Sequence, residues 1–508
     1  MSQELPIEET DAPATASAHK GGSPWKVICL FLLAYLVTRL GSLNALPIFL
    51  DEAVHIQWAE RLVNEGRLLR PVSAGRLLAV AVYALVLPFE DRLWTARALS
   101  SLAGAATLCF AMLLSNRLFG SRAAAVAGFL YLTSPFALVY DKLALSDGFL
   151  AASIAGLMWA FHALTQAPRS TVWRILVALL VALAILSKVS ALFFFGFIPC
   201  GVLALSDERR RLASLAATPV ACGLIVASPM LWAFVRSGRE IGAQHVVDPM
   251  NLGAVLDSTL RDMGQWLVSY FTVPTLVMAA IALLFMRERR TLWLASAAII
   301  PFVFFAAFSQ PWSARYVLPA LVPVLVLAAG GVAHVSNRAK PSIVPAATLT
   351  LALVAAAQAI PFSFALISDP ASAPFPKDDR LQLVTGWPSG YGIREAAARL
   401  KVESANAPAI VFVDTGGTRT LPTSLAVLLS GDTAVRLIEG DFASAQVQAA
   451  MNESSRHARV LALLSPRPDF DFKATMPLAN RLDVYQRPGG ERVATLFEMG
   501  AASSWRLF

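Results

Sequence analysis

Residues 25–48 read WKVICLFLLAYLVTRLGSLNALPI, and residues 49–62 continue directly as FLDEAVHIQWAERL. The first stretch is apolar and long enough to cross a bilayer, which takes roughly 20 residues. The second opens with two adjacent acids, Asp51 and Glu52, and then has the pattern of an amphipathic helix to about Glu65. The chain therefore leaves a membrane and at once presents two carboxylates at the interface.

The whole chain is too apolar for a water-soluble enzyme. Of its 508 residues 56% are hydrophobic and 15% are charged, and the mean hydropathy is +0.59, whereas soluble domains carry about 25% charged residues. The same composition excludes a disordered chain, a collagen and a small disulfide scaffold. The four cysteines all lie in apolar runs and form neither a disulfide framework nor a zinc-binding spacing. A multi-pass membrane protein with a soluble appendage remains.

Apolar runs predict a multi-pass α-helical membrane protein with about eleven spans. Lys188 interrupts one stretch, which is either two short spans or one long hairpin. The polar residues 1–24 are expected to be a disordered cytoplasmic tail, because a signal peptide has a basic start and a short apolar core. The spans are predicted at about 25–48, 94–114, 123–139, 147–164, 172–187, 189–205, 212–235, 266–286, 291–309, 316–334 and 342–362.

The net charge of +8 comes entirely from the part of the chain that contains the apolar runs. Residues 1–362 hold 27 basic and 19 acidic residues, whereas residues 363–508 hold 15 of each. Arginines and one lysine gather in alternate short loops, which predicts that these loops and the N-terminus are cytoplasmic. An odd number of spans then places residues 363–508 outside, and no nucleic-acid partner is indicated. The basic residues of these loops are Arg117, Arg122, Arg169, Arg174, Arg209, Arg210, Arg211, Arg287, Arg289, Arg290, Arg338 and Lys340.

Two of the predicted outer loops are long, at residues 49–93 and 236–265. The first loop contains Leu77–Phe89, whose 13 residues are too few to cross a bilayer and predict an interfacial or re-entrant helix. The second loop contains His245 and could cover a cavity as a lid.

Residues 363–508 predict a small α/β domain. Helices are expected near 391–403, 421–429 and 442–452, and strands near 407–415, 434–439 and 459–464. A hairpin follows, in which RLDVYQ and RVATLFEM flank the Pro-Gly-Gly of residues 488–490. The pair Gly416-Gly417 is not a dinucleotide-binding fingerprint.

Acids and cations gather at the predicted outer ends of the spans. Asp51 and Glu52 are either solvated interfacial charges or a general base with a metal or substrate ligand. Asp147 either caps the fourth span or faces a polar cavity. Lys188 either reaches the interface or holds an anion in that cavity.

Further candidates have two interpretations as well. Arg315 and Tyr316 are either membrane-interface anchors or a clamp for a phosphate, and Arg76 is of the same type. His55 lies four residues after Asp51, on one helical face with it, and a packing or hydrogen-bonding role is expected. Carboxylates that deprotonate a hydroxyl, beside cations that hold a lipid-linked phosphate, suit glycosyl transfer at the outer leaflet.

Several short stretches of the sequence resemble those of a known family and occur in the same order, which supports this interpretation. The chain resembles the GT-C superfamily, and within it glycosyltransferase family 39, the group of protein O-mannosyltransferases and lipid A aminoarabinose transferases. The resemblance is scattered over roughly residues 25–400. Its stretches are FLDEAVHIQWAERL (49–62), YDKLALSDGFLAAS (140–153), LAILSKVSALFFF (183–195), ARYVLPALVPVLVL (314–327) and GWPSGYGIREAAARL (386–400).

The resemblance implies an inverting transferase that uses a polyprenyl-phosphate-sugar donor on the periplasmic or lumenal face. Asp51 matches the catalytic acid after the first span, with Glu52 as its usual neighbour. Asp147 matches the second acidic position, and Tyr316 matches a tyrosine near the donor phosphate. Many relatives carry Lys-Pro-Pro or Glu-Lys-Pro before the short apolar segment, where this chain has Ser-Ala-Gly-Arg76. Arg76 is therefore expected to replace the lysine.

The predicted roles follow. Asp51 takes the proton of the acceptor hydroxyl, and the phosphate is neutralised by Arg76, Lys188, Arg315 and Tyr316. Glu52 and Asp147 orient the acceptor or hold a divalent cation, Mg²⁺ or Mn²⁺. The acceptor is a glycan, lipid or protein, and the protein is expected in the inner membrane among its lipids. The alternatives are a lipid or glycan transporter or flippase without chemistry, and a non-catalytic assembly protein.

Overall fold

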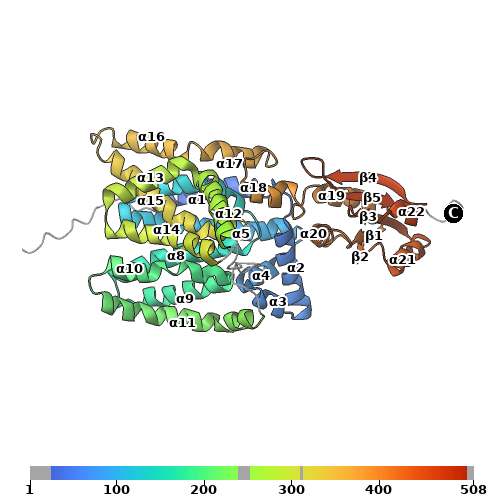
Figure 1. The fold of residues 1–508 in the computed structure, drawn as a ribbon, viewed down its shortest axis with the longest axis horizontal. Coiled ribbons are helices and arrows are strands. Elements are labelled where there is room, and N and C mark those ends of the chain that lie inside the picture. Colours follow the sequence, from blue (N-terminus) through green and yellow to red (C-terminus); the bar gives the residue numbers. More distant parts are fainter. Residues whose placement is uncertain (1–24, 238–251, 309–312, 469, 500–508) are drawn as a thin grey trace, which may run out of the picture.

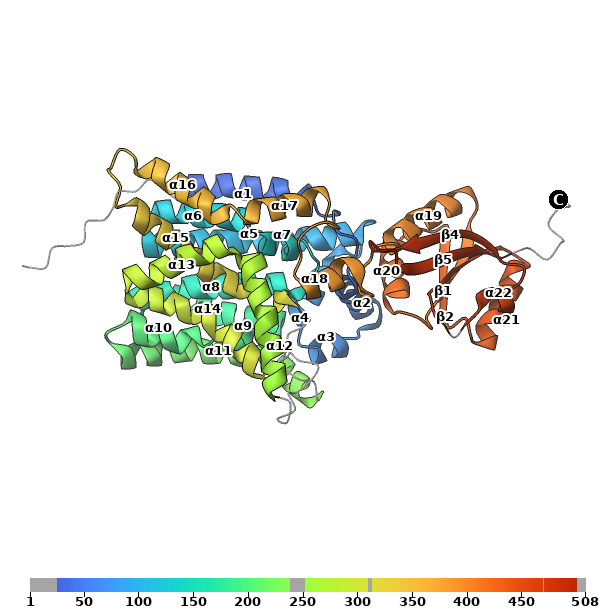
Figure 2. The same ribbon diagram turned by 45° about the horizontal axis from the view of Figure 1, so that its top comes forward.

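The computed structural model describes residues 25–237, 252–308, 313–468 and 470–499. A bundle of long helices forms one part of the molecule, and a smaller unit with a β-sheet projects from one end of the bundle (Figures 1 and 2). Residues 1–24 and His245 of the second long loop, two subjects of the sequence predictions, lie outside the described residues.

Helices occupy the position of every predicted span. The bundle contains α1 (Trp25–Leu40), α5 (Arg92–Phe119), α6 (Ser121–Thr133), α7 (Pro135–Tyr140), α8 (Ser146–Gln166), α9 (Thr171–Ser187), η2 (Val189–Phe194), α10 (Phe197–Leu205), α11 (Arg209–Arg236), α12 (Leu252–Trp266), η4 (Leu267–Thr272), α13 (Val273–Met286), α14 (Arg289–Phe308), η5 (Ala314–Ala320), α15 (Leu321–Ser336), α16 (Val344–Ala356) and α17 (Ala359–Ser368).

Six helices of the described residues are long and apolar enough to cross a membrane, or seven if α16 and α17, bent by 60°, form one span. Shorter apolar helices lie at Leu77–Val86, Thr171–Ser187 and Val189–Leu205. The count of eleven spans therefore stays a prediction. Around Lys188 the structure has two separate helices, because α9 ends at Ser187 and Lys188 itself is extended.

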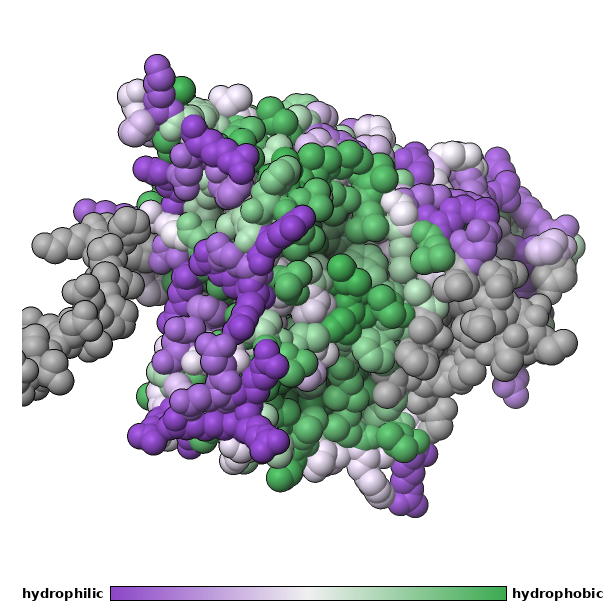
Figure 3. Space-filling view, turned by 60° about the vertical axis from the view of Figure 1, so that its left-hand side comes forward, coloured by the Kyte–Doolittle hydropathy of each residue, from purple (hydrophilic) through white to green (hydrophobic). Residues whose placement is uncertain are grey.

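The outer surface of the bundle is a belt of hydrophobic side chains. Figure 3 shows this belt between a hydrophilic band at the end opposite the sheet and the more polar surface of the sheet unit. Exposed members of the belt include Leu30, Ile225, Val235, Leu284 and Phe364, each more than 60% accessible. So much exposed apolar surface is unfavourable in water and is accommodated by lipid, so the protein is an integral membrane protein.

The five arginine-rich loops meet at the end of the bundle opposite the sheet. Arg122 donates to Asn337, and Arg290 donates to the carbonyl of Leu118. Arg289 pairs with Asp207 at 2.5 Å. The guanidinium of Arg117 lies over the ring of Trp173, which stands at the start of α9. Loops that alternate along the sequence in their content of basic residues therefore lie at opposite ends of the bundle, with the basic ones together at one end.

Short helices cover the other end of the bundle. They are α2 (Leu50–Glu65), α3 (Leu69–Ser73), α4 (Leu77–Tyr83) and η1 (Ala84–Val86), followed later in the chain by α18 (Lys377–Arg380) and η6 (Leu381–Thr385). The amphipathic helix expected after Asp51 is confirmed as α2, which buries Ala53, Ile56 and Ala59. The short apolar segment is confirmed as a helix, α4 with η1, which packs into the same small core as α2.

The sheet unit contains α19 (Ile393–Asn406), β1 (Ala409–Asp414), α20 (Thr420–Leu428), β2 (Val435–Gly440), α21 (Ala445–Ser455), β3 (Arg459–Leu464), α22 (Phe472–Thr475), β4 (Asn480–Gln486) and β5 (Arg492–Glu498). Its strand order is β2-β1-β3-β5-β4. β1 is parallel to both β2 and β3, and β5 is antiparallel to β3 and β4. The helices and strands predicted over this stretch are confirmed, with α22 as an additional short helix.

The junction between the two parts is built on close backbone contact. Leu50 N donates to the carbonyl of Pro388 at 3.1 Å, and Phe49 bridges Ser389. A Cβ atom on Gly390 would lie 2.0 Å from the carbonyl oxygen of Ile48, so only glycine fits. This contact holds the turn at residues 386–390 against the start of α2, where Asp51 stands.

We expect Gly390→Ala to destabilise the protein by about 1–3 kcal/mol, because the new methyl group overpacks a backbone contact. Thermal unfolding in mild detergent measures the effect. The control is Gly264→Ala in α12, where a Cβ atom would meet nothing within 4 Å, so this change is expected to be neutral or slightly stabilising. Equal melting temperatures of the two variants would contradict the prediction.

Candidate active site

Asp51 stands in the first turn of α2, two residues after Phe49, the extended residue that precedes the helix. A carboxylate at this position interacts favourably with the positive end of the helix dipole. Its Oδ2 atom accepts a hydrogen bond from Nη2 of Arg315 at 2.6 Å and lies 3.9 Å from Nη1 of Arg76. The Asp51 side chain is 28% exposed, so it is held by cations and still reaches solvent.

The pKa of Asp51 is the result of two opposing effects. Burial alone would raise it, but the charges of Arg315 and Arg76 together hold it well below its ordinary value. Asp51 is therefore ionised at neutral pH. As long as Arg315 is its partner, Asp51 is also a weak base.

A second ion pair lies beside the first. Nζ of Lys188 donates to Oδ1 of Asp147 at 2.7 Å, and both side chains are buried. The Lys188 ammonium also lies 4.1 Å from the ring centre of Tyr316, and Cζ of Arg315 lies 5.8 Å from the same centre. The Tyr316 ring thus lies near both cations, and the structure joins the Asp51 and Asp147 pairs into one cluster.

A glycine aligns two of the cations. Gly75 has a positive φ of 65°, and a Cβ atom there would lie 2.5 Å from the Val189 side chain. The carbonyl of Gly75 accepts a hydrogen bond from Val189 N at 3.2 Å. This contact brings Arg76 and Lys188, neighbours of the two bonded residues, to the same place.

His55 serves as a polar bridge. Its ring is fully buried, with Nδ1 3.2 Å from the carbonyl of Ala144 and Nε2 3.2 Å from Nη1 of Arg76. A neutral ring that donates from Nδ1 can accept from Arg76 at Nε2. Burial, aided by the charge of Arg76, lowers the pKa of His55 to about 4. His55 therefore positions Arg76, in line with the hydrogen-bonding role expected from the sequence.

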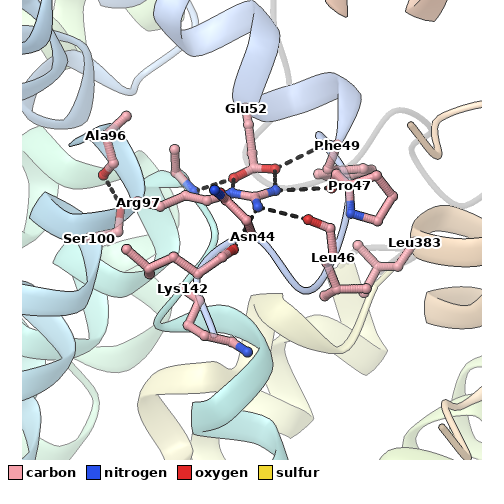
Figure 4. Close-up of polar contacts among 12 residues, drawn as sticks. Asn44, Leu46, Pro47, Phe49, Glu52, Ala96, Arg97, Ser100, Lys142 and Leu383 are labelled. Carbon is pink, nitrogen blue, oxygen red and sulfur yellow. Dashed lines mark hydrogen bonds and ion pairs between the residues drawn. The ribbon is translucent and has the colours of Figure 1, made fainter. Parts of the chain in front are cut away.

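Glu52 faces away from this cluster, into the protein. Its two oxygens accept hydrogen bonds from Nε and Nη2 of Arg97 at 2.8 and 2.6 Å, from Ala144 N at 2.7 Å and from Phe49 N at 2.9 Å. Arg97 also donates to three backbone carbonyls, those of Leu43, Leu46 and Pro47 (Figure 4). These five hydrogen bonds match the five N–H donors of the guanidinium.

The environment of Glu52 differs from the expected one. The sequence predicted a side chain that contacts the acceptor or a metal ion, but all of its partners are protein groups and its exposure is 0%. Glu52 is a positioning residue that ties the loop 43–49 to α2 and α5. Arg97 was missed, because it lies within a predicted span; a charged residue inside a span is itself a signal of a polar partner.

The residues proposed for a divalent ion do not fit one. The oxygens of Glu52 are occupied by Arg97, and Asp147 is paired with Lys188. Within the described ranges no group of three or more His, Cys, Asp or Glu residues could hold a metal ion.

A cleft of about 560 Å³ opens onto the cluster. Asp51, Arg76, Arg315 and Tyr316 line one side of it. The other lining residues come from the start of α2, from α12 and from α18 with the segment after it, including Asp262, Asp378 and Trp387. Lys188, Asp147 and Glu52 stand behind this lining. Four of the eight predicted site residues therefore face the cleft, and the others support them.

A buried acid also secures the far wall of the cleft. Asp379 of α18 accepts hydrogen bonds from the hydroxyls of Tyr140 at 2.5 Å, Tyr270 at 2.6 Å and Ser313 at 2.8 Å. These donors come from α7, η4 and the start of η5, so one carboxylate joins three segments far apart in the sequence. The sequence offered no local pattern for this cluster.

Comparison with known proteins identifies the fold. Residues 77–232 match the family model described as dolichyl-phosphate-mannose-protein mannosyltransferase. Similar solved structures have the GT-C glycosyltransferase fold, which confirms the resemblance drawn from the sequence. The protein thus has the GT-C fold over nearly its whole length. A search of curated protein sequences found no match.

Two solved structures of ArnT from Cupriavidus metallidurans are similar to nearly the whole chain. The form bound to undecaprenyl phosphate has 15% identity and a TM-score of 0.62, over 95% of this chain and 99% of that one. The apo form has 16% identity and a TM-score of 0.59, over 94% and 98%. The archaeal oligosaccharyltransferase AglB from Archaeoglobus fulgidus, in complex with an inhibitory peptide and a dolichol-phosphate, has 12% identity and a TM-score of 0.52, over 96% and 75%. At these identities the likeness is one of fold.

We expect Glu52→Gln to destabilise the protein by about 3–5 kcal/mol, because it leaves the Arg97 guanidinium buried without its counter-charge. The melting temperature in detergent reports the change. The matched control is Glu60→Gln, whose pair with Arg92 is about one-quarter exposed and should contribute about 1 kcal/mol or less. A Glu52→Gln protein as stable as this control would show that the buried pair does not hold the site.

A pH dependence follows from His55. Its pKa is lowered from 6.5 to about 4 on folding, so between these values the unfolded chain binds a proton that the folded chain does not. The free energy of unfolding is therefore unaffected by His55 above pH 6.5 and decreases as the pH falls toward 4. The whole decrease is about 3 kcal/mol, at 1.36 kcal/mol for each unit of pKa difference. His55→Gln should therefore lose less stability than the wild type between pH 7 and 4.5, as thermal melts at each pH would show. Parallel curves would contradict the assignment of a neutral His55.

Proposed function

We propose that the protein is an inverting glycosyltransferase that moves a sugar from a polyprenyl-phosphate-sugar donor to an acceptor hydroxyl at the outer face of the membrane. The observation that carries the proposal is Asp51, an ionised, partly exposed carboxylate on the wall of the cleft, 2.6 Å from Arg315. The fold supports it, because the similar structures of ArnT and AglB hold undecaprenyl phosphate and a dolichol-phosphate, respectively.

The cations suit the donor. A polyprenyl-phosphate-sugar is a phosphodiester with one negative charge, and its phosphate gains a second charge when the sugar leaves. Arg76 and Arg315 line the cleft, and Lys188 lies behind Tyr316. Guanidinium groups match phosphate oxygens in geometry and charge, and cations placed where charge develops stabilise the transition state more than the ground state.

The donor would also activate the base. In the structure Arg315 and Arg76 lower the basicity of Asp51. A donor phosphate between these guanidinium groups would neutralise part of their charge and draw Arg315 away from the carboxylate. The pKa of Asp51 would then rise toward its ordinary range, so that the base becomes effective when the donor is in place.

The reaction would be a single in-line displacement. The acceptor oxygen bonds to the anomeric carbon, the bond from that carbon to the phosphate oxygen breaks, and the acceptor proton passes to Asp51. The polyprenyl phosphate leaves with the bonding electron pair. One displacement inverts the anomeric configuration, whereas retention would need a carboxylate nucleophile against the sugar. The acceptor would be a glycan, lipid or protein hydroxyl.

We also propose the orientation. The basic loops gathered at one end of the bundle favour the cytoplasmic side, which assigns residues 1–24 to the cytoplasm. The candidate site and the α/β unit within residues 363–508 would then be periplasmic, with the catalytic part in residues 25–362 of an inner-membrane protein. The first stretch after residue 362 packs on the helices, since Phe375, Leu383 and Val384 lie in the core of the bundle.

We expect Asp51→Asn to lower the transfer rate by roughly 10²–10⁴-fold, the usual contribution of a general base. Donor binding should be kept or strengthened, because the variant removes a negative charge beside the phosphate site. Sugar transfer and binding of radiolabelled polyprenyl-phosphate sugars, tested with detergent-purified protein, measure the two effects, and Glu60→Gln serves as the control.

The two readouts separate the proposal from its alternatives. Normal turnover by a folded Asp51→Asn protein would remove Asp51 as the base. Donor binding without turnover by the wild type, across a panel of donors and acceptors, would instead favour a flippase. Loss of neither binding nor function in the variant would favour an assembly protein.

A further inference from the structure

A second cavity, of about 710 Å³, lies at the end of the bundle opposite the candidate site. It is lined by the last turns of α5, α8 and α10 and the first turns of α9 and α14, including Arg117, His162, Trp173 and Arg290. Nothing in the proposed reaction uses it. Basic loops form its rim, since Arg290 donates to the carbonyl of Leu118 and Arg289 pairs with Asp207.

Arg117 is presented to this cavity by two indole rings. Its Cζ atom lies 4.9 Å from the ring centre of Trp159 and 5.0 Å from that of Trp173. No residue in the described part of the chain accepts a hydrogen bond from its guanidinium, so its N–H donors are available to a ligand. Cation–π contacts hold the group in place without using these donors.

One residue of this lining, His162, holds a buried polar atom. His162 is 9% exposed and lines the cavity, yet its Nδ1 atom has no hydrogen-bond partner among the described residues. Its ring stacks on Trp293 with centres 6.1 Å apart. A buried polar atom without a partner is unfavourable, and a ligand oxygen or hydroxyl in the cavity would satisfy it.

The remaining charges at the rim are already paired. Arg289 binds Asp207, and Arg290 binds Glu288 and the carbonyl of Leu118. Among the described residues that line the cavity, Arg117 is therefore the arginine without an acidic partner, and the ligand that complements it is an anion. Apolar lining from Leu118, Ala204 and Leu205 favours an anion attached to a lipid over a free ion.

We propose that this cavity binds the phosphate of an anionic phospholipid from the leaflet opposite the candidate active site. Arg117 donates to the phosphate oxygens in the forked geometry that guanidinium and phosphate share. His162 bonds the glycerol or head-group oxygens through Nδ1, and Trp173 packs on the acyl ester region as interfacial tryptophans do. Basic pockets between transmembrane helices are suited to such head groups.

Native mass spectrometry of the full-length protein tests this site. Detergent-purified protein is incubated with phosphatidylglycerol or with phosphatidylcholine, and the lipid retained after mild activation is counted. The variants are Arg117→Gln and His162→Phe, which keeps an aromatic ring. The matched control is Arg122→Gln, an exposed arginine at the same end that pairs with Asn337 and does not line the cavity.

The wild type and the control should retain one phosphatidylglycerol in preference to phosphatidylcholine. Arg117→Gln should weaken this retention about tenfold or more, the usual effect of losing a charge-assisted hydrogen bond, and His162→Phe should weaken it by a smaller factor. Equal retention by Arg117→Gln and the wild type would overturn the proposal, and so would equal loss in Arg122→Gln.

Inorganic phosphate distinguishes the source of the anion. If millimolar phosphate raises the melting temperature of the wild type but not of Arg117→Gln, while phosphatidylglycerol is not retained, the site binds a free anion and the lipid assignment is wrong. If Arg117→Gln does not fold, His162→Phe decides alone, because retention equal to that of the wild type would overturn the proposal.

Discussion

The buried ion pair between Glu52 and Arg97 is the interaction on which the candidate site depends. Arg97 collects the carbonyls of residues 43–47 and the Glu52 carboxylate into one hydrogen-bonded unit, with every donor used. Removing two charges from water is costly, and only such complete pairing compensates for it. The chain must therefore leave α1, turn and start α2 in one register, which directs Asp51 toward Arg315 while Glu52 faces Arg97. Two adjacent acids thus have different surroundings and different roles.

Around Asp51 the protein balances charges rather than isolating one group. Arg76, Arg315 and Lys188 bring three cations to a place where two acids are already present. The cluster thereby carries one net positive charge in place of three, and its cations are oriented by His55 and by the Tyr316 ring. An anionic ligand would exchange partners within this cluster instead of meeting unpaired charges. Such a site is organised before the ligand arrives, which lowers the cost of binding.

The two ends of the bundle differ in how their charged side chains are arranged. The end beside the sheet pairs its cations with acids in a cleft, whereas the opposite end concentrates arginines at the boundary of the apolar belt. Even there most cations have partners, and Arg117 is distinguished by indole rings in place of acids. The α/β unit contacts the first end through α20 and α2, where Gln57 donates to the carbonyl of Thr423. A movement of that unit would therefore displace α2, the helix that carries Asp51.

The sequence by itself determined the membrane class, the positions of the apolar helices, the α/β alternation after residue 390 and the ends at which acids and cations gather. Each of these depends on composition or on a short period, so neighbouring residues suffice to reveal it. Only the tertiary structure decided the pairings. Asp51 and Arg315 are 264 residues apart, Asp379 binds donors from three separate segments, and the partner of Glu52 lies inside a helix that looks like an ordinary span. Such pairings depend on how helices pack side by side, which no local pattern encodes.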